Sequence, residues 1–311
     1  MDSAAALLIL PIAAAALLLL RSAWEKKQLC TEHYTFHTAK LPKGEHIRLV
    51  FLSDLHSVSF GQGNVRLLEA IECLKPDAVL IGGDMITCGK TTQRAPQTGV
   101  CTHLMEQLCL RYPVYYAEGN HEQRFEKRFP LEYSLFRQHL CQTAGLHDIS
   151  TKPEKIQPLK RTAAKRQGQE KAIAVLAAPL DAAYYGKLKP GFGRKKELPK
   201  DALLRLLGRP QKDRFQVLLL HSPMYLKEAA AWGADLVLSG HFHGGTIRLP
   251  FLGGLMTPQY QFFVKECAGL HRIGEQAMIA NRGLGTHSIR IRIHNLPEIS
   301  CIDIEGTQEG T

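Results

Sequence analysis

Short, almost wholly apolar runs recur along this chain, and each is followed by a cluster of polar residues. Runs of this length and character are typical of strands covered on both faces of a sheet. The five clearest runs are residues 46–52, 78–81, 114–117, 215–220 and 234–238. Amphipathic spacing predicts helices at residues 64–74 and 102–110, the first of them stopped by Pro76. Alternating strands and helices predict an α/β protein.

The C-terminal part has a different pattern. Residues 289–293 read Ile-Arg-Ile-Arg-Ile, a strict alternation that predicts a half-exposed strand. Residues 299–304 offer a partner strand, and residues 34–37 near the start predict another. We therefore expect a second, antiparallel portion of sheet that completes a sandwich.

An uninterrupted apolar segment covers residues 4–20, with only Pro11 to disturb a helix. About 17 residues at roughly 1.5 Å each are just enough to cross a bilayer core. The sequence therefore predicts an N-terminal transmembrane helix, with Trp24 at an interface. A cleaved signal peptide and a buried core helix are the alternatives. The acidic start at Asp2 disfavours the signal peptide.

Cations follow this segment at Arg21, Lys26 and Lys27. By the positive-inside rule the rest of the chain would then lie in the cytoplasm, held at the cell membrane by a single span. We divide the chain into an anchor with its linker at residues 1–28 and one domain at residues 29–311. The eight cysteines lack any C-x-x-C pair, which fits reduced thiols in that compartment.

The formal net charge is +10, which indicates anionic partners such as phosphorylated substrates, acidic lipids or nucleic acid. Two basic stretches contribute, an insertion at about residues 151–171 and a second at 187–200. They are interpreted as solvated loops, or as contacts with anionic lipid headgroups. Nucleic acid is disfavoured as a partner because aromatic residues are not interleaved with the cations.

The polar clusters behind the strands carry the candidate chemistry. In open α/β sheets, sites form beyond the carboxyl ends of the strands, so these side chains should converge. Glycine beside several of them permits tight turns. Mixed oxygen and imidazole ligands suit Mn, Fe or Zn better than Ca or Mg. The candidate metal ligands are Asp54, His56, Asp84, Asn120, His221, His241 and His243.

The ordered motifs around these residues resemble those of the calcineurin-like metallophosphoesterases. They are D-x-H, G-D, G-N-H-E, an isolated histidine after a strand, and G-H-x-H, at residues 54–56, 83–84, 119–122, 221 and 240–243. Segments at 281–285 and 295–299 also resemble a membrane-anchored bacterial branch related to UDP-2,3-diacylglucosamine pyrophosphatases. The resemblance implies a four-layer α/β/β/α sandwich that binds two divalent metal ions, with Mn favoured over Fe or Zn.

The resemblance also implies a role for each residue. Asp54, His56 and His243 would hold one metal, and Asn120, His221 and His241 the other, with Asp84 bridging them. His121 would serve the leaving group as general acid or by stabilising charge. Arg124 and Arg282 are candidates for gripping a substrate phosphate. Thr87, Met224 and Phe242 depart from the pattern of that branch without replacing a ligand.

These residues predict a hydrolase of phosphoester or pyrophosphate bonds that uses a water activated by two metals. An anchor would favour a lipid-linked or nucleotide-sugar substrate such as UDP-2,3-diacylglucosamine. The alternatives are a phosphodiesterase or phosphatase of soluble nucleotides or phosphoproteins, and a non-catalytic membrane scaffold that binds acidic lipid. A degenerate scaffold should have lost a ligand, yet all seven and His121 are present.

Overall fold

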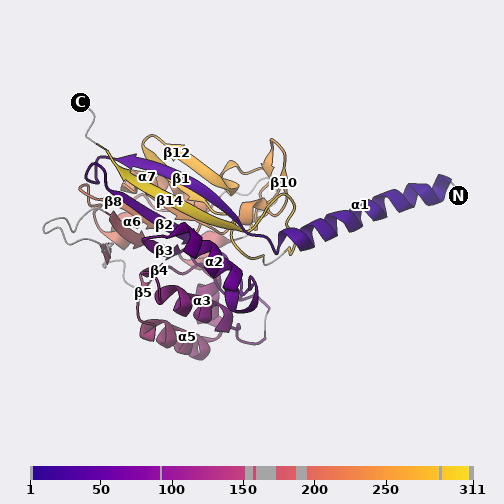
Figure 1. Ribbon diagram of the computed structural model, residues 1–311, viewed down its shortest axis with the longest axis horizontal. Coiled ribbons are helices and arrows are strands. Elements are labelled where there is room, and N and C mark those ends of the chain that lie inside the picture. Colours follow the sequence, from indigo (N-terminus) through magenta and orange to yellow (C-terminus); the bar gives the residue numbers. More distant parts are fainter. Residues whose placement is uncertain are drawn as a thin grey trace.

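A computed structural model of the chain describes residues 3–91, 93–150, 157–158, 173–186, 195–286 and 289–307. Two mixed sheets, each of six strands, form its centre (Figure 1). The first sheet has the order β1 (Cys30–Thr38), β14 (Glu298–Gly306), β2 (His46–Leu52), β3 (Ala78–Ile81), β4 (Val114–Tyr116), β5 (Leu146–Asp148). The second has the order β12 (Gly269–Ile273), β13 (Gln276–Ala280), β9 (Leu236–Ser239), β8 (Phe215–Leu219), β7 (Ile173–Ala177), β6 (Gln157–Pro158).

Parallel pairing places the carboxyl ends of the central strands at one edge of each sheet. In the first sheet β2, β3, β4 and β5 are parallel, and β14 joins β2 antiparallel and β1 parallel. In the second sheet β7, β8, β9 and β13 are parallel, with antiparallel β6 and β12 at the two edges. A small ribbon of β10 (Arg248–Leu249) and β11 (Gly253–Gly254) lies apart from both sheets.

Three apolar cores separate four layers. Strand β2 shows why its apolar run has no polar face: Leu49 and Phe51 pack between the two sheets, whereas Val50 and Leu52 pack under helices. The helices over the first sheet are α2 (Val65–Leu74), α3 (Gly99–Cys109), α4 (Asn120–Arg128) and α5 (Pro130–Gln142). Those over the second are α6 (Ala202–Leu207) and α7 (Leu226–Trp232). The α/β sandwich predicted from the sequence is therefore confirmed.

Local sequence sets where these helices begin and end. Helix α2 ends at Lys75, which takes a left-handed backbone just before Pro76. Helix α5 begins at Pro130, whose missing N–H costs nothing in the first turn. Helix α7 ends at Gly233, where a φ of 114° suits glycine.

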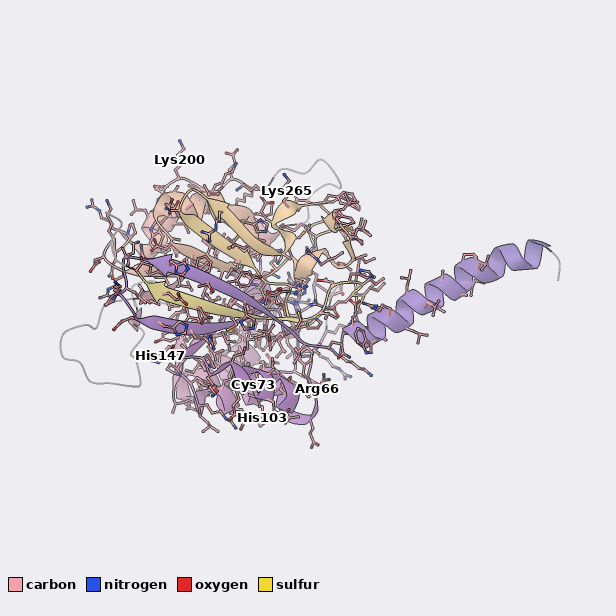
Figure 2. All side chains as sticks on the ribbon, turned by 45° about the horizontal axis from the view of Figure 1, so that its top comes forward. Arg66, Cys73, His103, His147, Lys200 and Lys265 are labelled. Carbon is pink, nitrogen blue, oxygen red and sulfur yellow. The ribbon has the colours of Figure 1, made fainter. Side chains whose placement is uncertain are left out.

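Helix α1 (Ser3–Glu25) projects away from the body, and the side chains of its described outer part stand in the open (Figures 1 and 2). Within the described residues, no helix combines the length and the apolar character needed to cross a membrane. The transmembrane anchor predicted for residues 4–20 is therefore not supported. The cytoplasmic location of the remaining chain stays a prediction.

The two basic stretches are only partly visible. Of the insertion at residues 151–171, the structure describes the strand β6 alone, so its lysines and arginines lie outside the described residues. In the second stretch, Lys195 forms an ion pair with Glu228, 2.6 Å from Nζ to Oε1, and Lys200 points away from the body (Figure 2).

The strand predicted at residues 289–293 is wrong. Among the described residues of this segment only an isolated bridge joins Ile293 to Ile247, and the partner expected for it, β14, pairs with β1 and β2 instead. The alternation misleads because its two arginines have opposite environments. Arg290 is exposed, whereas Arg292 is 1% exposed and donates hydrogen bonds to four backbone carbonyls.

This difference predicts unequal costs for two similar substitutions. Arg292→Ala should lower the free energy of unfolding by about 3 kcal/mol or more, because it leaves several buried carbonyls without a donor. Arg290→Ala should change it by less than about 0.5 kcal/mol, because the side chain is solvated. Urea unfolding followed by circular dichroism measures both, and similar values for the two variants would contradict the burial of Arg292.

Candidate active site

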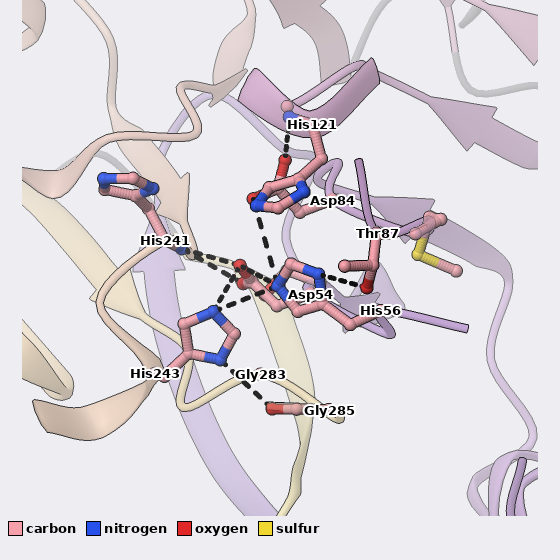
Figure 3. A network of polar contacts seen from close by, with 12 residues as sticks. Asp54, His56, Asp84, Thr87, His121, His241, His243, Gly283 and Gly285 are labelled. Atoms are coloured by element: carbon pink, nitrogen blue, oxygen red, sulfur yellow. Dashed lines mark hydrogen bonds and ion pairs between the residues drawn. The ribbon is translucent and has the colours of Figure 1, made fainter. Parts of the chain in front are cut away.

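Five strands deliver the predicted metal ligands to one place. Asp54 and His56 follow β2, Asp84 follows β3, and Asn120 begins α4 just beyond β4. His221 follows β8, and His241 and His243 follow β9. All seven side chains and His121 lie in residues that are no more than 6% exposed. The convergence expected at the carboxyl ends of the strands is thus present, across both sheets (Figure 3).

Short distances join the members of the site. His243 Nε2 lies 3.3 Å from Asp54 Oδ1 and 3.2 Å from His56 Nε2. His221 Nε2 lies 3.2 Å from Asp84 Oδ2 and 3.9 Å from Asp54 Oδ1. Ligand atoms within 4.8 Å of one another form three overlapping groups: Asp54, His56 and His243; His56, Asp84 and His121; Asp84, His221 and His241.

Backbone carbonyls fix the orientation of two imidazoles. The Nδ1 atom of His221 lies 2.7 Å from the carbonyl oxygen of Gly82, and that of His243 lies 3.1 Å from the carbonyl of Gly285. A carbonyl can only accept, so Nδ1 carries the proton in both rings and Nε2 is turned toward the carboxylates, as Figure 3 shows for His243. This arrangement is typical of histidines that bind a metal through Nε2.

His121 has the opposite tautomer. Its Nδ1 accepts a hydrogen bond of 2.9 Å from the backbone N–H of Cys88. In the neutral ring the proton therefore sits on Nε2, which lies 3.9 Å from Asp84 Oδ2. Of these three imidazoles, His121 is the one oriented to present a proton to the centre of the site.

The two aspartates fit into spaces that only glycine leaves open. A Cβ atom on Gly119 would lie 2.3 Å from Asp84 Oδ1, and one on Gly240 would lie 2.1 Å from Asp54 Oδ2. The backbone also donates to the carboxylates: Asp84 accepts from the N–H of His121 at 2.7 Å, and Asp54 from that of His241 at 3.0 and 3.1 Å. The glycines noted in the sequence therefore provide close approach as well as tight turns.

The ionisation of each side chain in this site depends on the charges of its neighbours. Burial alone disfavours ionised Asp84, but the neighbouring His221 and His121 outweigh it and hold the pKa of Asp84 well below its usual range. Burial also lowers the pKa of His221, yet the carboxylate of Asp84 raises it to about 10. Burial raises the pKa of Asp54 to about 6, helped by the charge of Asp84. The site therefore attracts positive charge.

The two arginines proposed to grip phosphate have partners within the protein. Arg282 forms ion pairs with Glu298, 2.8 Å from Nε to Oε2, and with Glu32. Arg124 donates from Nη1 to the carbonyl of Cys88 at 2.7 Å. Their role as phosphate contacts stays a prediction, and the structure shows them occupied with the protein's own acceptors.

Sequence reasoning missed two supporting residues. Glu122 is fully buried and accepts from the backbone N–H groups of Asp84, Met85 and Gly119 at 2.8 to 3.0 Å, which ties the loop after β3 to the start of α4. Thr87 lies with Oγ1 3.2 Å from His56 Nδ1 (Figure 3). The last letter of G-N-H-E was the available signal for Glu122, because an acid at the third helical position typically caps a helix.

Comparison with known proteins agrees with this geometry. The family model of the calcineurin-like phosphoesterases matches residues 47–245, a range that contains all seven candidate ligands. The uncharacterized metallophosphoesterase YkuE of Bacillus subtilis is 36% identical over 101 residues, which are 32% of this chain and 35% of that protein. The phosphodiesterase YaeI of Escherichia coli is 24% identical over 83% of this chain and 82% of its own. An uncharacterized metallophosphoesterase of Aquifex aeolicus is 23% identical over 89% of this chain and 92% of its own.

The strand ends gather carboxylates and imidazoles in one place, and the family match covers the whole of that cluster. The chain therefore belongs to the calcineurin-like phosphoesterases and is a hydrolase.

Proposed function

We propose that the protein hydrolyses phosphodiester or pyrophosphate bonds with the help of two divalent metal ions. The main support is the convergence of two buried carboxylates with imidazoles from both sheets, whose ligand atoms lie within 4.8 Å in each group. The likeness to YaeI, which is named a phosphodiesterase, supports a diester over a monoester.

The residues present fit a pair of metals. The side-chain oxygen Oδ1 of Asn120 is buried and has no hydrogen-bond partner in the described part of the chain, as expected of an atom reserved for a cation. One metal would be held by Asp54, His56 and His243, the other by Asn120, His221 and His241, and Asp84 would serve both. When bound, such a pair polarises the phosphoryl group and lowers the pKa of water. The mixed ligands favour manganese, with iron or zinc as alternatives.

The chain itself supplies a hydrogen-bond donor for the leaving group. Hydrolysis adds the oxygen of water to phosphorus and breaks the bond from phosphorus to the ester oxygen, which must then be protonated. His121 Nε2 carries a proton and faces the site, because Nδ1 is occupied by the N–H of Cys88. We assign His121 as the donor of a hydrogen bond that stabilises the charge developing on the departing ester oxygen, which then takes its proton from water.

A neighbouring pocket supports a substrate with an apolar arm. The pocket has a volume of about 40 Å³ and contains His243 in its wall. Its apolar lining comes from Met256, Pro258, Tyr260, Ile289 and Ile291. A lipid-linked ester such as UDP-2,3-diacylglucosamine would place its phosphate between the ligands and a short part of an acyl chain here.

Two variants separate metal binding from chemistry. Asp84→Asn removes the charge placed to balance both cations, so occupancy of both sites should fall together. His121→Ala leaves every proposed ligand in place, so it should retain two metals while turnover falls by about 100- to 1,000-fold. Elemental analysis beside the rate on bis(p-nitrophenyl) phosphate measures both. An Asp84→Asn protein with two metals and near-normal turnover would refute the two-metal proposal.

The apolar arm can be tested in the pocket. Met256→Asp places a charge among apolar side chains, so we expect KM for a diester with a long acyl chain to rise about tenfold, which corresponds to about 1.4 kcal/mol. Turnover of bis(p-nitrophenyl) phosphate should change by less than about twofold. Leu252→Asp, an exposed position outside the pocket lining, is the control. Equal KM values for wild type and Met256→Asp on the acyl diester would exclude the pocket as its site.

A further inference from the structure

The last turn of α1 is fastened to the body by buried polar groups, although the residues at positions 10–20 of the helix are exposed and apolar. The side chain of Glu25 is 0% exposed. Its two oxygens accept from the backbone N–H groups of His294 at 3.0 Å and Asn295 at 2.9 Å. Ser22 Oγ accepts from the N–H of Arg292 at 3.0 Å. Burying a carboxylate is costly unless it is hydrogen-bonded, so these contacts fix the helix against one loop, residues 292–295.

The same loop holds the backbone of His243. Asn295, fully buried, donates from Nδ2 to the carbonyl oxygen of His243 at 2.7 Å. Gly244 leaves the room for this contact, because a Cβ atom there would lie 2.3 Å from Asn295 Oδ1. A hydrogen-bonded path therefore runs from Glu25 through Asn295 to His243.

A second path reaches the imidazole ring. Arg292 donates from Nη2 to the carbonyl of Gly285 at 2.7 Å, and this carbonyl also accepts the Nδ1 proton of His243 at 3.1 Å. The loop thus contacts both the main chain of His243 and the group that orients its ring. The ring of His221 is instead oriented by the carbonyl of Gly82, which follows β3 and is far from α1 in sequence.

We propose that Glu25 is a positioning residue for His243, so that the last turn of α1 is part of the support of one metal site. The proposal rests on the proposed function only in taking His243 as a metal ligand. Its effect should be unequal. The site formed with Asp54 and His56 depends on Glu25, whereas the site formed with Asn120, His221 and His241 does not.

The experiment measures metal binding directly in the full chain. Glu25→Ala and wild type are stripped of metal and titrated with Mn²⁺, by calorimetry and by electron paramagnetic resonance. Loss of an outer partner of a ligand typically weakens metal affinity about 10- to 100-fold. We expect this loss at one of the two sites and less than about threefold change at the other. Lys26→Ala is the control, because Lys26 contacts the carbonyl of Arg290, outside residues 292–295.

A double variant tests the path itself. If Glu25 acts through Asn295, the loss in Glu25→Ala with Asn295→Ala should not exceed that of the stronger single variant, whereas independent effects would multiply. If Glu25→Ala folds poorly, Glu25→Gln takes its place. It retains the size and one acceptor, and should show a smaller loss at the same site. Unchanged binding in both Glu25 variants, equal weakening of both sites, or losses of affinity that multiply in the double variant would overturn the proposal. Failure of the proposed function would appear differently, as a wild-type chain that does not bind two metals.

Discussion

Two carboxylates buried side by side are the constraint on which this structure depends. Asp54 and Asp84 are 0% and 1% exposed, and both lie within 4 Å of imidazole nitrogens. In a low dielectric these two negative charges repel each other strongly, and only nearby cations offset the repulsion. Imidazoles that take up protons can balance them, but each is then lost as a ligand. Divalent metals balance the same charge without protonated rings, so metal binding should release protons and stabilise the folded chain.

The backbone around these carboxylates is itself strained. Five of the eight site residues have positive φ although none is glycine: Asp54, His56, Asp84, His241 and His243. A left-handed conformation costs such a residue about 1 to 2 kcal/mol, and it persists only where packing enforces it. Here the enforcement comes from two sheets whose shared core includes Leu49 and Val217, both 0% exposed. The packing of the sandwich therefore holds these residues in the strained backbone conformation that directs their side chains into the site.

The apolar runs predicted the central strands closely, because a strand that is covered on both faces is apolar at successive positions and does not have to be recognised from an alternating pattern. Residues 46–52 and 78–81 are β2 and β3 with the same bounds. The polar clusters behind them were visible for the same reason, since they interrupt an apolar pattern. The strand predicted at residues 289–293 is wrong because periodicity cannot distinguish a solvated arginine from one that donates hydrogen bonds to four carbonyls. The ion pairs of Arg282 were also not predictable from the sequence, since its partners Glu32 and Glu298 are remote from it along the chain.

Glu25 was beyond reach of sequence reasoning, because an acid after a long apolar run is ordinarily read as its solvated end. Only the tertiary fold brings residues 292–295 against that turn, some 270 positions later in the chain. Once they meet, the helix and the site share hydrogen bonds: a movement of the last turn of α1 that broke the bonds of Glu25 would leave the N–H of Asn295 without its acceptor and loosen the side chain that holds His243. Because α1 extends away from the body, a force applied along the helix would act on that turn (Figure 1). The route from α1 to His243 is therefore short, since it consists of the hydrogen bonds of Glu25 and Asn295.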